Sequence, residues 1–175
     1  YILTLSAYCN GKIDEWDVIN EAIVNNGYRT NTWYDVVNNQ PTEDGIIGFD
    51  AYFANLFEWA RQADNNVALF YNDYNIEPFG TSKNIFMRNL VKRLKFEYNA
   101  PIDGVGLQSH FNIDQVTPLF ISKIGQTIDD LAQSDFTVNI TELDIRICEE
   151  HNGTIEEQKE AYKGIVSTAF ERDNC

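Results

Sequence analysis

The chain has 175 residues, which suits one domain with a sizeable hydrophobic core. Hydrophobic residues make up 43% and charged residues 23%, a composition typical of folded globular proteins and not of disordered ones. The 27 acidic and 13 basic side chains give a formal net charge of −14. Because phosphate groups would be repelled over most of such a surface, this charge argues against a nucleic acid or an anionic membrane as a partner.

No apolar run reaches the roughly 18 residues that a membrane span needs, and no signal peptide is visible. The chain starts mid-pattern at Tyr1, without an initiator methionine, so we interpret it as a mature or cut product. Cys9, Cys148 and Cys175 are too few and too scattered for a disulfide framework or a zinc site. At least one thiol is expected to be free or paired outside the chain. We expect no metal and no cofactor.

Short apolar runs alternate with helical patterns along the chain. The runs are rich in β-branched or aromatic residues and mostly apolar on both faces, which is typical of parallel strands covered by helices. Strands are expected at residues 13–19, 67–71, 104–107 and 138–141. Apolar residues at helical spacing predict helices around residues 49–60, 86–94, 121–131 and 162–169, a partial helix at 1–9, and a short helix at 32–38 within the polar connection 27–48.

The order of these elements predicts a parallel α/β architecture. Ser82 and Thr117-Pro118 have the residue types of helix starts. Repeated strand–helix alternation implies right-handed crossovers and a parallel sheet. Four strands with four helices fit either a small open sheet or a piece of a closed barrel. A full eight-fold barrel takes about 250 residues, so a barrel would be roughly half present here.

Polar side chains cluster directly after each predicted strand. In parallel α/β folds the carboxyl ends of the strands form one rim where sites are built, so these clusters are expected around one cleft. They are Asn20-Glu21, Asn72-Asp73-Tyr74, Gln108-Ser109-His110 and Glu142-Leu143-Asp144. The alternative, helix caps and loop polar residues, fits Asp73 and Asn75. It fits Glu21 and Glu142 poorly, because glutamate is a weak cap and each follows an apolar run.

Two carboxylates facing each other across a cleft are what glycoside hydrolysis needs. One is protonated and donates to the leaving oxygen, while the other is ionised and attacks the anomeric carbon or activates water. A separation of about 5–5.5 Å gives a covalent intermediate and retention, and about 6.5–9.5 Å gives inversion. The sequence places Glu21 and Glu142 on different strands and leaves this distance open.

His110 is a candidate partner of Glu142. Asp144 lies two residues after Glu142, so on an extended backbone both side chains point to the same side. A Glu142–His110–Asp144 network would hold Glu142 ionised and oriented. The alternative is a histidine that is simply satisfied within the core or a loop.

Four segments together resemble family 10 of the glycoside hydrolases, the endo-β-1,4-xylanases. Residues 16–22 (WDVINEA) are similar to the acid/base motif of that family. Residues 72–75 (NDYN), 106–110 (GLQSH) and 140–145 (ITELDI) are similar to its next three strand ends, in the same order. The resemblance covers essentially the whole chain. It implies a (β/α)₈ TIM-type barrel of which about the fourth to seventh βα units are present, with residues 1–175 as a partial catalytic domain.

The resemblance also implies roles for individual residues. Glu21 is expected to be the general acid/base and Glu142 the nucleophile, with net retention. His110, assisted by Asp144, is expected to hold Glu142. Expected sugar contacts are Asn20 at the 2-hydroxyl beside the cleavage point, Gln108 near the scissile bond, and Asn72 and Tyr74 on the leaving-group side, with Tyr74 stacking on a xylose ring.

The chain also departs from the family pattern. The family's first three strands and its eighth are absent, so both carboxylates are present with about half of the substrate cleft. We therefore expect a longer working enzyme, with the remainder of the barrel as a partner and xylan or xylo-oligosaccharide as the substrate. Many relatives pair a cysteine at the place of Cys175 with one a few residues earlier, and residues 167–170 (STAF) offer none. The substrate implies a secreted, cell-surface or periplasmic protein.

Two alternatives stay open for the function. One is a non-catalytic xylan-binding or scaffold fragment, because the missing half barrel could leave this chain without chemistry of its own. The other is a retaining β-1,4-glucanase of the same structural group, with the same mechanism and a different sugar.

Overall fold

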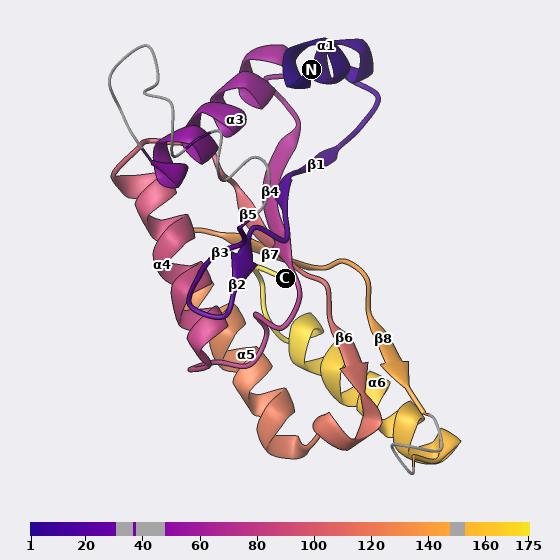
Figure 1. Ribbon diagram of the computed structural model, residues 1–175. Helices are drawn as coiled ribbons and strands as arrows, with labels where there is room; N and C mark the ends of the chain where they lie inside the picture. The colour runs from indigo at the N-terminus through magenta and orange to yellow at the C-terminus, as the bar shows by residue number, and fades with distance from the viewer. Residues whose placement is uncertain (31–36, 38–47, 148–152) are drawn as a thin grey trace.

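The computed structural model describes residues 1–30, 37, 48–147 and 153–175. Helices and strands alternate along these residues (Figure 1). The helices are α1 (Ile2–Cys9), α3 (Phe49–Ala63), α4 (Ser82–Phe96), α5 (Pro118–Ala132) and α6 (Ile155–Phe170), with a 3₁₀ turn η1 (Ile113–Gln115). The strands are β1 (Glu15–Asn20), β2 (Ile23–Val24), β3 (Gly27–Tyr28), β4 (Ala68–Asp73), β5 (Gly104–Leu107), β6 (His110–Asn112), β7 (Thr137–Ile140) and β8 (Asp144–Arg146).

Four strands form one parallel sheet in the order β1-β4-β5-β7. A long helix follows each of them in the chain: α3 after β1, α4 after β4, α5 after β5 and α6 after β7. Figure 1 shows α3, α4 and α5 one after another along one side of the strands. The predicted strands and long helices are therefore confirmed, although α4 and α6 begin well before the predicted ranges 86–94 and 162–169.

Local sequence signals explain where the helices begin. Thr117 accepts a hydrogen bond from a backbone N–H of the first turn of α5, and Pro118 occupies its first position. Thr81 caps α4 in the same way, so that Ser82 is its first residue. Both predicted helix starts are confirmed.

The hydrophobic core lies between the parallel sheet and its helices. Every residue of β5 is buried, and so is nearly every residue of β4, because both strands have a neighbour on each side. Phe53 and Phe57 of α3, and Leu90 and Leu94 of α4, are buried members of this core. Burying one such side chain contributes about 1.5–3 kcal/mol, so this core fixes the strand ends on a rigid base.

Two small sheets lie beyond the ends of the main strands and were not predicted. β2 and β3 form an antiparallel hairpin directly after β1. The interpretation of residues 27–48 as a loop was therefore wrong at its first residues, since β3 lies there. β6 and β8 form a parallel pair that continues β5 and β7, with His110 opposite Asp144. The predicted helix at 32–38 lies almost entirely outside the described residues.

Strand pairing in the described part of the chain leaves β1 and β7 as the edges of the main sheet. A groove of about 450 Å³ lies between the end of β1 and the aromatic face of α3. A second hollow, of about 770 Å³, lies between β7, residues of β1 and the exposed apolar end of α6. Both edges thus carry apolar surface that no described segment covers.

Three features are absent among the residues that the structure describes: a membrane-spanning helix, a metal-binding group of side chains and a disulfide. None of the described helices is long and apolar enough to cross a bilayer. No group of three histidine, cysteine or acidic side chains among the described residues is arranged to hold a metal ion. Cys9 and Cys175 form no disulfide there, and Cys148 lies outside the described ranges.

Candidate active site

The carboxyl ends of the four parallel strands meet at one rim of the sheet. The strand register aligns these ends, because Asn20 pairs with Asn72, and Leu107 pairs with both Asp73 and Ile140. All of the side chains predicted to form the site come to this rim, where hydrogen bonds link them. They are Asn20, Glu21, Asn72, Tyr74, Gln108, His110, Glu142 and Asp144.

Glu21 is the first residue after β1 and has a constrained backbone. Its φ is 57°, in the left-handed region that residues with side chains seldom occupy. The Glu21 N–H donates to the Asn72 carbonyl at 2.9 Å, which ties this residue to the neighbouring strand. Between Asp17 and Ile19 the register of β1 shifts against β4. Such irregularities change the direction of the side chains that follow, and Glu21 follows this one by two residues.

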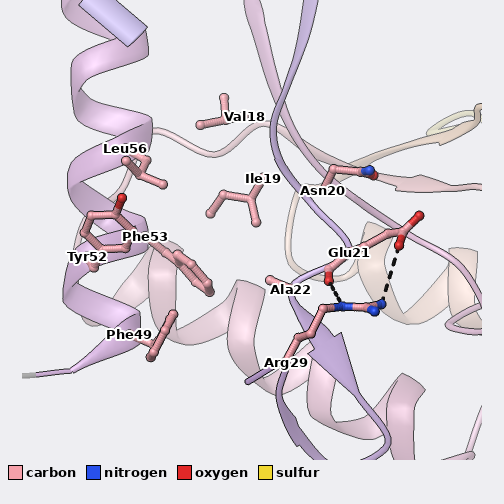
Figure 2. Close-up of a pocket in the computed structure, with 10 residues that line it drawn as sticks. All are labelled: Val18, Ile19, Asn20, Glu21, Ala22, Arg29, Phe49, Tyr52, Phe53 and Leu56. Carbon is pink, nitrogen blue, oxygen red and sulfur yellow. Dashed lines mark hydrogen bonds and ion pairs between the residues drawn. The ribbon is translucent and has the colours of Figure 1, made fainter. Parts of the chain in front are cut away.

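Arg29 belongs to the site although the sequence analysis did not single it out. The β2–β3 hairpin returns the chain so that Arg29 Nε donates to the Glu21 carbonyl at 2.8 Å. Arg29 Nη2 lies 3.4 Å from Glu21 Oε2 and donates to the Tyr74 hydroxyl at 3.2 Å. Figure 2 shows the Glu21 carboxylate directed away from the aromatic side chains of α3, with Arg29 beside it.

The electrostatic setting of Arg29 follows from these contacts. The hydrogen bond with Tyr74 raises the pKa of Arg29 further above its usual value, and the Glu21 charge adds to this rise against partial burial. Arg29 is therefore a permanent cation beside the Glu21 carboxylate. The sequence holds little signal for it, because an arginine in a polar stretch has no periodic pattern.

Asn72 is the central hydrogen-bonding residue of the rim. Its Nδ2 donates to Asn20 Oδ1 at 3.1 Å and to Glu142 Oε1 at 3.0 Å. Its Oδ1 accepts from the Thr141 hydroxyl at 2.9 Å. Gly106 leaves the necessary room on the adjacent strand, because a Cβ there would lie 2.4 Å from Asn72 Oδ1. Any larger residue at Gly106 would displace the Asn72 amide.

A continuous path of hydrogen bonds joins the two glutamates. Gln108 Nε2 donates to Glu21 Oε1 at 3.3 Å and to Asn20 Oδ1 at 3.0 Å. Asn20 Oδ1 also accepts from Asn72, which donates to Glu142. Glu21 and Glu142 thus share one cluster of amide donors although they come from opposite edges of the sheet.

Glu142 is held from its other side by a histidine. His110 Nε2 lies 3.2 Å from Glu142 Oε2, and His110 Nδ1 lies 2.5 Å from Asp144 Oδ2. The β6–β8 pair sets this geometry, because His110 and Asp144 are opposite each other in its register. A histidine between two carboxylates can fix the orientation of both through its two ring nitrogens.

The protonation of His110 depends on both of its carboxylate partners. Partial burial lowers the pKa of His110, but the hydrogen bond and charge of Asp144, with a smaller contribution from Glu142, raise it above the usual value. A pKa that is higher in the folded than in the unfolded protein means that the imidazolium favours folding. This contribution is complete below the unfolded pKa and is lost as the pH rises through the folded pKa.

We expect Asp144→Asn to lower the pKa of His110 towards its usual value, because the main charge that favours the imidazolium disappears. An NMR titration of the imidazole in the full-length protein measures this, with the signal assigned by its loss in His110→Asn. Asp129→Asn is the control, since that carboxylate pairs with Arg172 and not with the rim. An unchanged His110 pKa in Asp144→Asn would contradict the coupling.

Asp17 adds a further carboxyl that the sequence analysis did not consider. Burial raises the pKa of Asp17 above its usual value, and the charges of Glu142 and Glu15 add to the rise. Glu15 accepts a hydrogen bond from the Asn139 side chain at 2.7 Å, across from β7. The Glu142 carboxylate therefore lies near a second, partly buried carboxyl group, on β1.

A buried ion pair between Asp73 and Lys83 stabilises the end of β4 at the rim. Asp73 is fully buried, and its Oδ1 accepts from Lys83 Nζ at 2.7 Å while its Oδ2 accepts from the Tyr71 hydroxyl at 2.6 Å. The interpretation of Asp73 as a cap or loop residue was therefore wrong: it is the last residue of β4, and Thr81 caps α4. Breaking a buried pair by removing one partner costs about 3–5 kcal/mol, so this pair anchors the end of β4.

The chain is similar to known proteins over most of its length. Residues 1–175 match the model of glycosyl hydrolase family 10. The endo-1,4-beta-xylanase of Agaricus bisporus is 34% identical over 174 residues, covering 98% of this chain and 47% of that protein. The exoglucanase XynX of Acetivibrio thermocellus is 40% identical over 133 residues, covering 75% of this chain and 11% of that protein.

A solved structure shows the same fold. The crystal structure of the GH10 xylanase from Bispora sp. MEY-1 with xylobiose superposes with a TM-score of 0.84 at 33% identity, covering 99% of this chain and 50% of that one. The expected fold, part of a (β/α)₈ barrel, is thereby confirmed. The chain spans about half of that structure, and half or less of each of the two relatives named above.

Proposed function

The chain belongs to glycosyl hydrolase family 10, and from this premise we propose that it forms the catalytic centre of a retaining endo-β-1,4-xylanase. The observation that carries the proposal is the hydrogen-bonded path from Glu21 through Gln108, Asn20 and Asn72 to Glu142. It brings two carboxyl groups to one rim together with donors for sugar hydroxyls. The similar xylanases named above support xylan as the substrate.

In the first step the Glu142 carboxylate attacks the anomeric carbon, and the bond from that carbon to the bridging oxygen breaks. Protonated Glu21 gives its proton to the bridging oxygen, so the leaving sugar departs as an alcohol. His110, held by Asp144, orients the Glu142 carboxylate.

In the second step water attacks the anomeric carbon of the glycosyl-enzyme, and the ester bond to Glu142 breaks. Glu21, now ionised, takes the proton of that water. The Arg29 guanidinium, 3.4 Å from Glu21 Oε2, helps to hold the Glu21 side chain in place. Two inversions at one carbon give net retention of configuration.

The remaining rim residues recognise the substrate. Asn20 hydrogen-bonds the 2-hydroxyl next to the cleavage point, where such bonds strengthen in the transition state. Gln108 contacts the sugar near the scissile bond. Asn72 and Tyr74 lie on the leaving-group side, where Tyr74 stacks on a xylose ring. A neutral polysaccharide needs no steering by charge, which is compatible with the net charge of −14.

Residues 1–175 form a partial catalytic domain in this proposal, and the working enzyme is longer. The uncovered grooves beside β1 and β7 support this, because the remaining βα units of a barrel would cover both edges. Since xylan is an extracellular polymer, we place the enzyme outside the cell, at its surface or in the periplasm. It acts without a metal or another cofactor.

The decisive experiment uses the full-length protein that contains these residues. Incubation with xylan is expected to release xylo-oligosaccharides of several lengths from the start, as internal cleavage requires. Proton NMR of the first product is expected to show the β anomer before mutarotation. No release of reducing sugar from xylan contradicts the proposed activity, and a first product in the α form contradicts retention.

A β-1,4-glucanase is the second candidate, because the similar exoglucanase XynX bears the name of an enzyme that acts on glucan. Rates on xylan and on carboxymethylcellulose, measured side by side, separate the two. We expect the higher rate on xylan. Binding of the full-length protein to xylan without turnover of either polymer would instead favour a non-catalytic role.

A further inference from the structure

The turn between β5 and β6 carries two of the side chains that the proposed mechanism uses. Gln108 contacts Glu21, and His110 contacts Glu142. Ser109 lies between them and is fully buried. The direction of both neighbouring side chains depends on the backbone at Ser109.

Ser109 holds an unfavourable backbone conformation. Its φ is 63°, in the left-handed region, which a serine seldom occupies unless its surroundings impose it. The turn moves the chain from β5, in the main sheet, to β6, which pairs with β8. Contacts of Ser109 with the rest of the protein must therefore stabilise this turn.

The backbone N–H of Ser109 is held by a buried carboxyl. It donates to Glu77 Oε1 at 2.8 Å. Glu77 is fully buried and lies between β4 and α4, on a different segment from the turn. An amide hydrogen buried without an acceptor would destabilise the protein, and no other partner of this N–H is found within the described residues.

We propose that Glu77 is a positioning residue of the active site. By accepting the Ser109 N–H it holds the left-handed turn, and the turn aims Gln108 at Glu21 and His110 at Glu142. Glu77 touches neither substrate nor the reacting carboxylates. The inference rests on the proposed function, because that function gives Gln108 and His110 their roles.

The environment of Glu77 indicates which property of the side chain matters. Burial raises the pKa of Glu77 to about 7, against backbone hydrogen bonds from its own residue and from Ser109 and against the Lys83 charge. Its Oε2 has no hydrogen-bond partner among the described residues. A neutral carboxyl still offers one carbonyl oxygen as an acceptor without burying a full charge. A glutamine of the same shape offers that oxygen too, and a methionine does not.

The test compares Glu77→Met with Glu77→Gln in the full-length enzyme. Glu77→Met keeps the length of the side chain but removes the acceptor, so we expect kcat on xylan to fall by about 10²-fold with a much smaller change in KM. Glu77→Gln keeps the acceptor and is expected to retain most of the kcat. Equal losses in the two folded variants would overturn the proposal.

Thr127→Val is the control for general loss of stability. Thr127 is fully buried on α5 and accepts a hydrogen bond from the Asn84 side chain at 2.9 Å, so its loss also leaves a buried donor unpaired. We expect Thr127→Val to unfold at a lower temperature but to keep its kcat. A fall in kcat as large as that of Glu77→Met would show that any buried defect suffices, and would overturn the proposal.

The pKa of His110 gives a readout that needs no turnover. If the turn relaxes in Glu77→Met, His110 moves away from Asp144 and Glu142, and its pKa falls towards the usual value. An NMR titration identical to that of the parent would overturn the proposal. A parent that does not hydrolyse xylan would contradict the proposed function instead, and this titration would still test the role of Glu77.

Glu77→Gln tests the role of Glu77 even when Glu77→Met does not fold. A folded Glu77→Gln with both a lowered kcat and a lowered His110 pKa would show that an acceptor oxygen alone does not hold the turn. The expected result is a parental His110 titration and near-parental kcat.

Discussion

Replacing Glu142 by alanine is expected to lower kcat on xylan by about 10⁴-fold or more, which corresponds to about 5 kcal/mol of lost transition-state stabilisation. Without the carboxylate no glycosyl ester can form, and water that enters the vacated space is a much weaker nucleophile than the carboxylate. Initial rates of reducing-sugar release by the full-length protein measure the effect. Glu160→Ala is the control, because Glu160 is an exposed α6 residue paired only with Lys163 at 3.7 Å among the described residues.

Added azide separates loss of a nucleophile from loss of the fold. In Glu142→Ala the shortened side chain leaves space for a small anion on the face that the carboxylate occupied. With an activated aryl xyloside, azide is expected to attack the anomeric carbon there and to give the α-xylosyl azide after a single inversion. Activity equal to that of the parent, with or without azide, would remove Glu142 as the nucleophile.

Replacing Glu21 by alanine is expected to lower kcat on xylan by about 10²–10⁴-fold, the usual contribution of general acid–base catalysis. The effect depends on the leaving group, because a nitrophenolate departs without a proton and a sugar alcohol does not. Formation of the glycosyl-enzyme from an aryl xyloside is therefore expected to stay fast, with a slow second step. Stopped-flow measurement of nitrophenol release is expected to show a burst followed by slow turnover.

Azide gives the opposite stereochemistry in this variant. It is expected to replace the water that Glu21 activates and to release the β-xylosyl azide, since Glu142 still forms the intermediate. Glu160→Ala again serves as the surface control. Equal losses on xylan and on the aryl xyloside, without a burst, would contradict the acid/base assignment of Glu21.

The pattern of apolar residues in the sequence was sufficient to predict the strands of the main sheet and the helices that follow them. β4 and β5 are buried on both faces, and their uninterrupted apolar residues distinguish them from their surroundings. Thr117 and Pro118 were sufficient to predict the start of α5, because a capping side chain and a proline at the first helical position act on neighbouring residues only. The position of rim residues at strand ends followed from chain order alone, because parallel strands bring their carboxyl ends to one side.

The parts that escaped prediction depend on contacts between distant segments. The β2–β3 hairpin has two residues in each strand, too few for a period, and Arg29 reaches Glu21 only through it. In the sequence, Glu77 and Asp73 resemble acidic residues of exposed loops. In the structure both are buried by other elements and hold parts of the fold in place. No local pattern gives the distance between such groups or their protonation.

The pairing of β6 with β8 makes the contact between His110 and Asp144 depend on the number of residues that separate β5 from β6 and β7 from β8. His110 meets Asp144 because the two residues are opposite each other in that ladder, each a fixed number of residues beyond the end of its main strand. Side chains alternate between the faces of a strand, so one residue inserted or deleted before either position turns the imidazole or its partner to the far face. Loops elsewhere can vary in length, whereas the segments between β5 and β6 and between β7 and β8 are expected to tolerate no insertion or deletion.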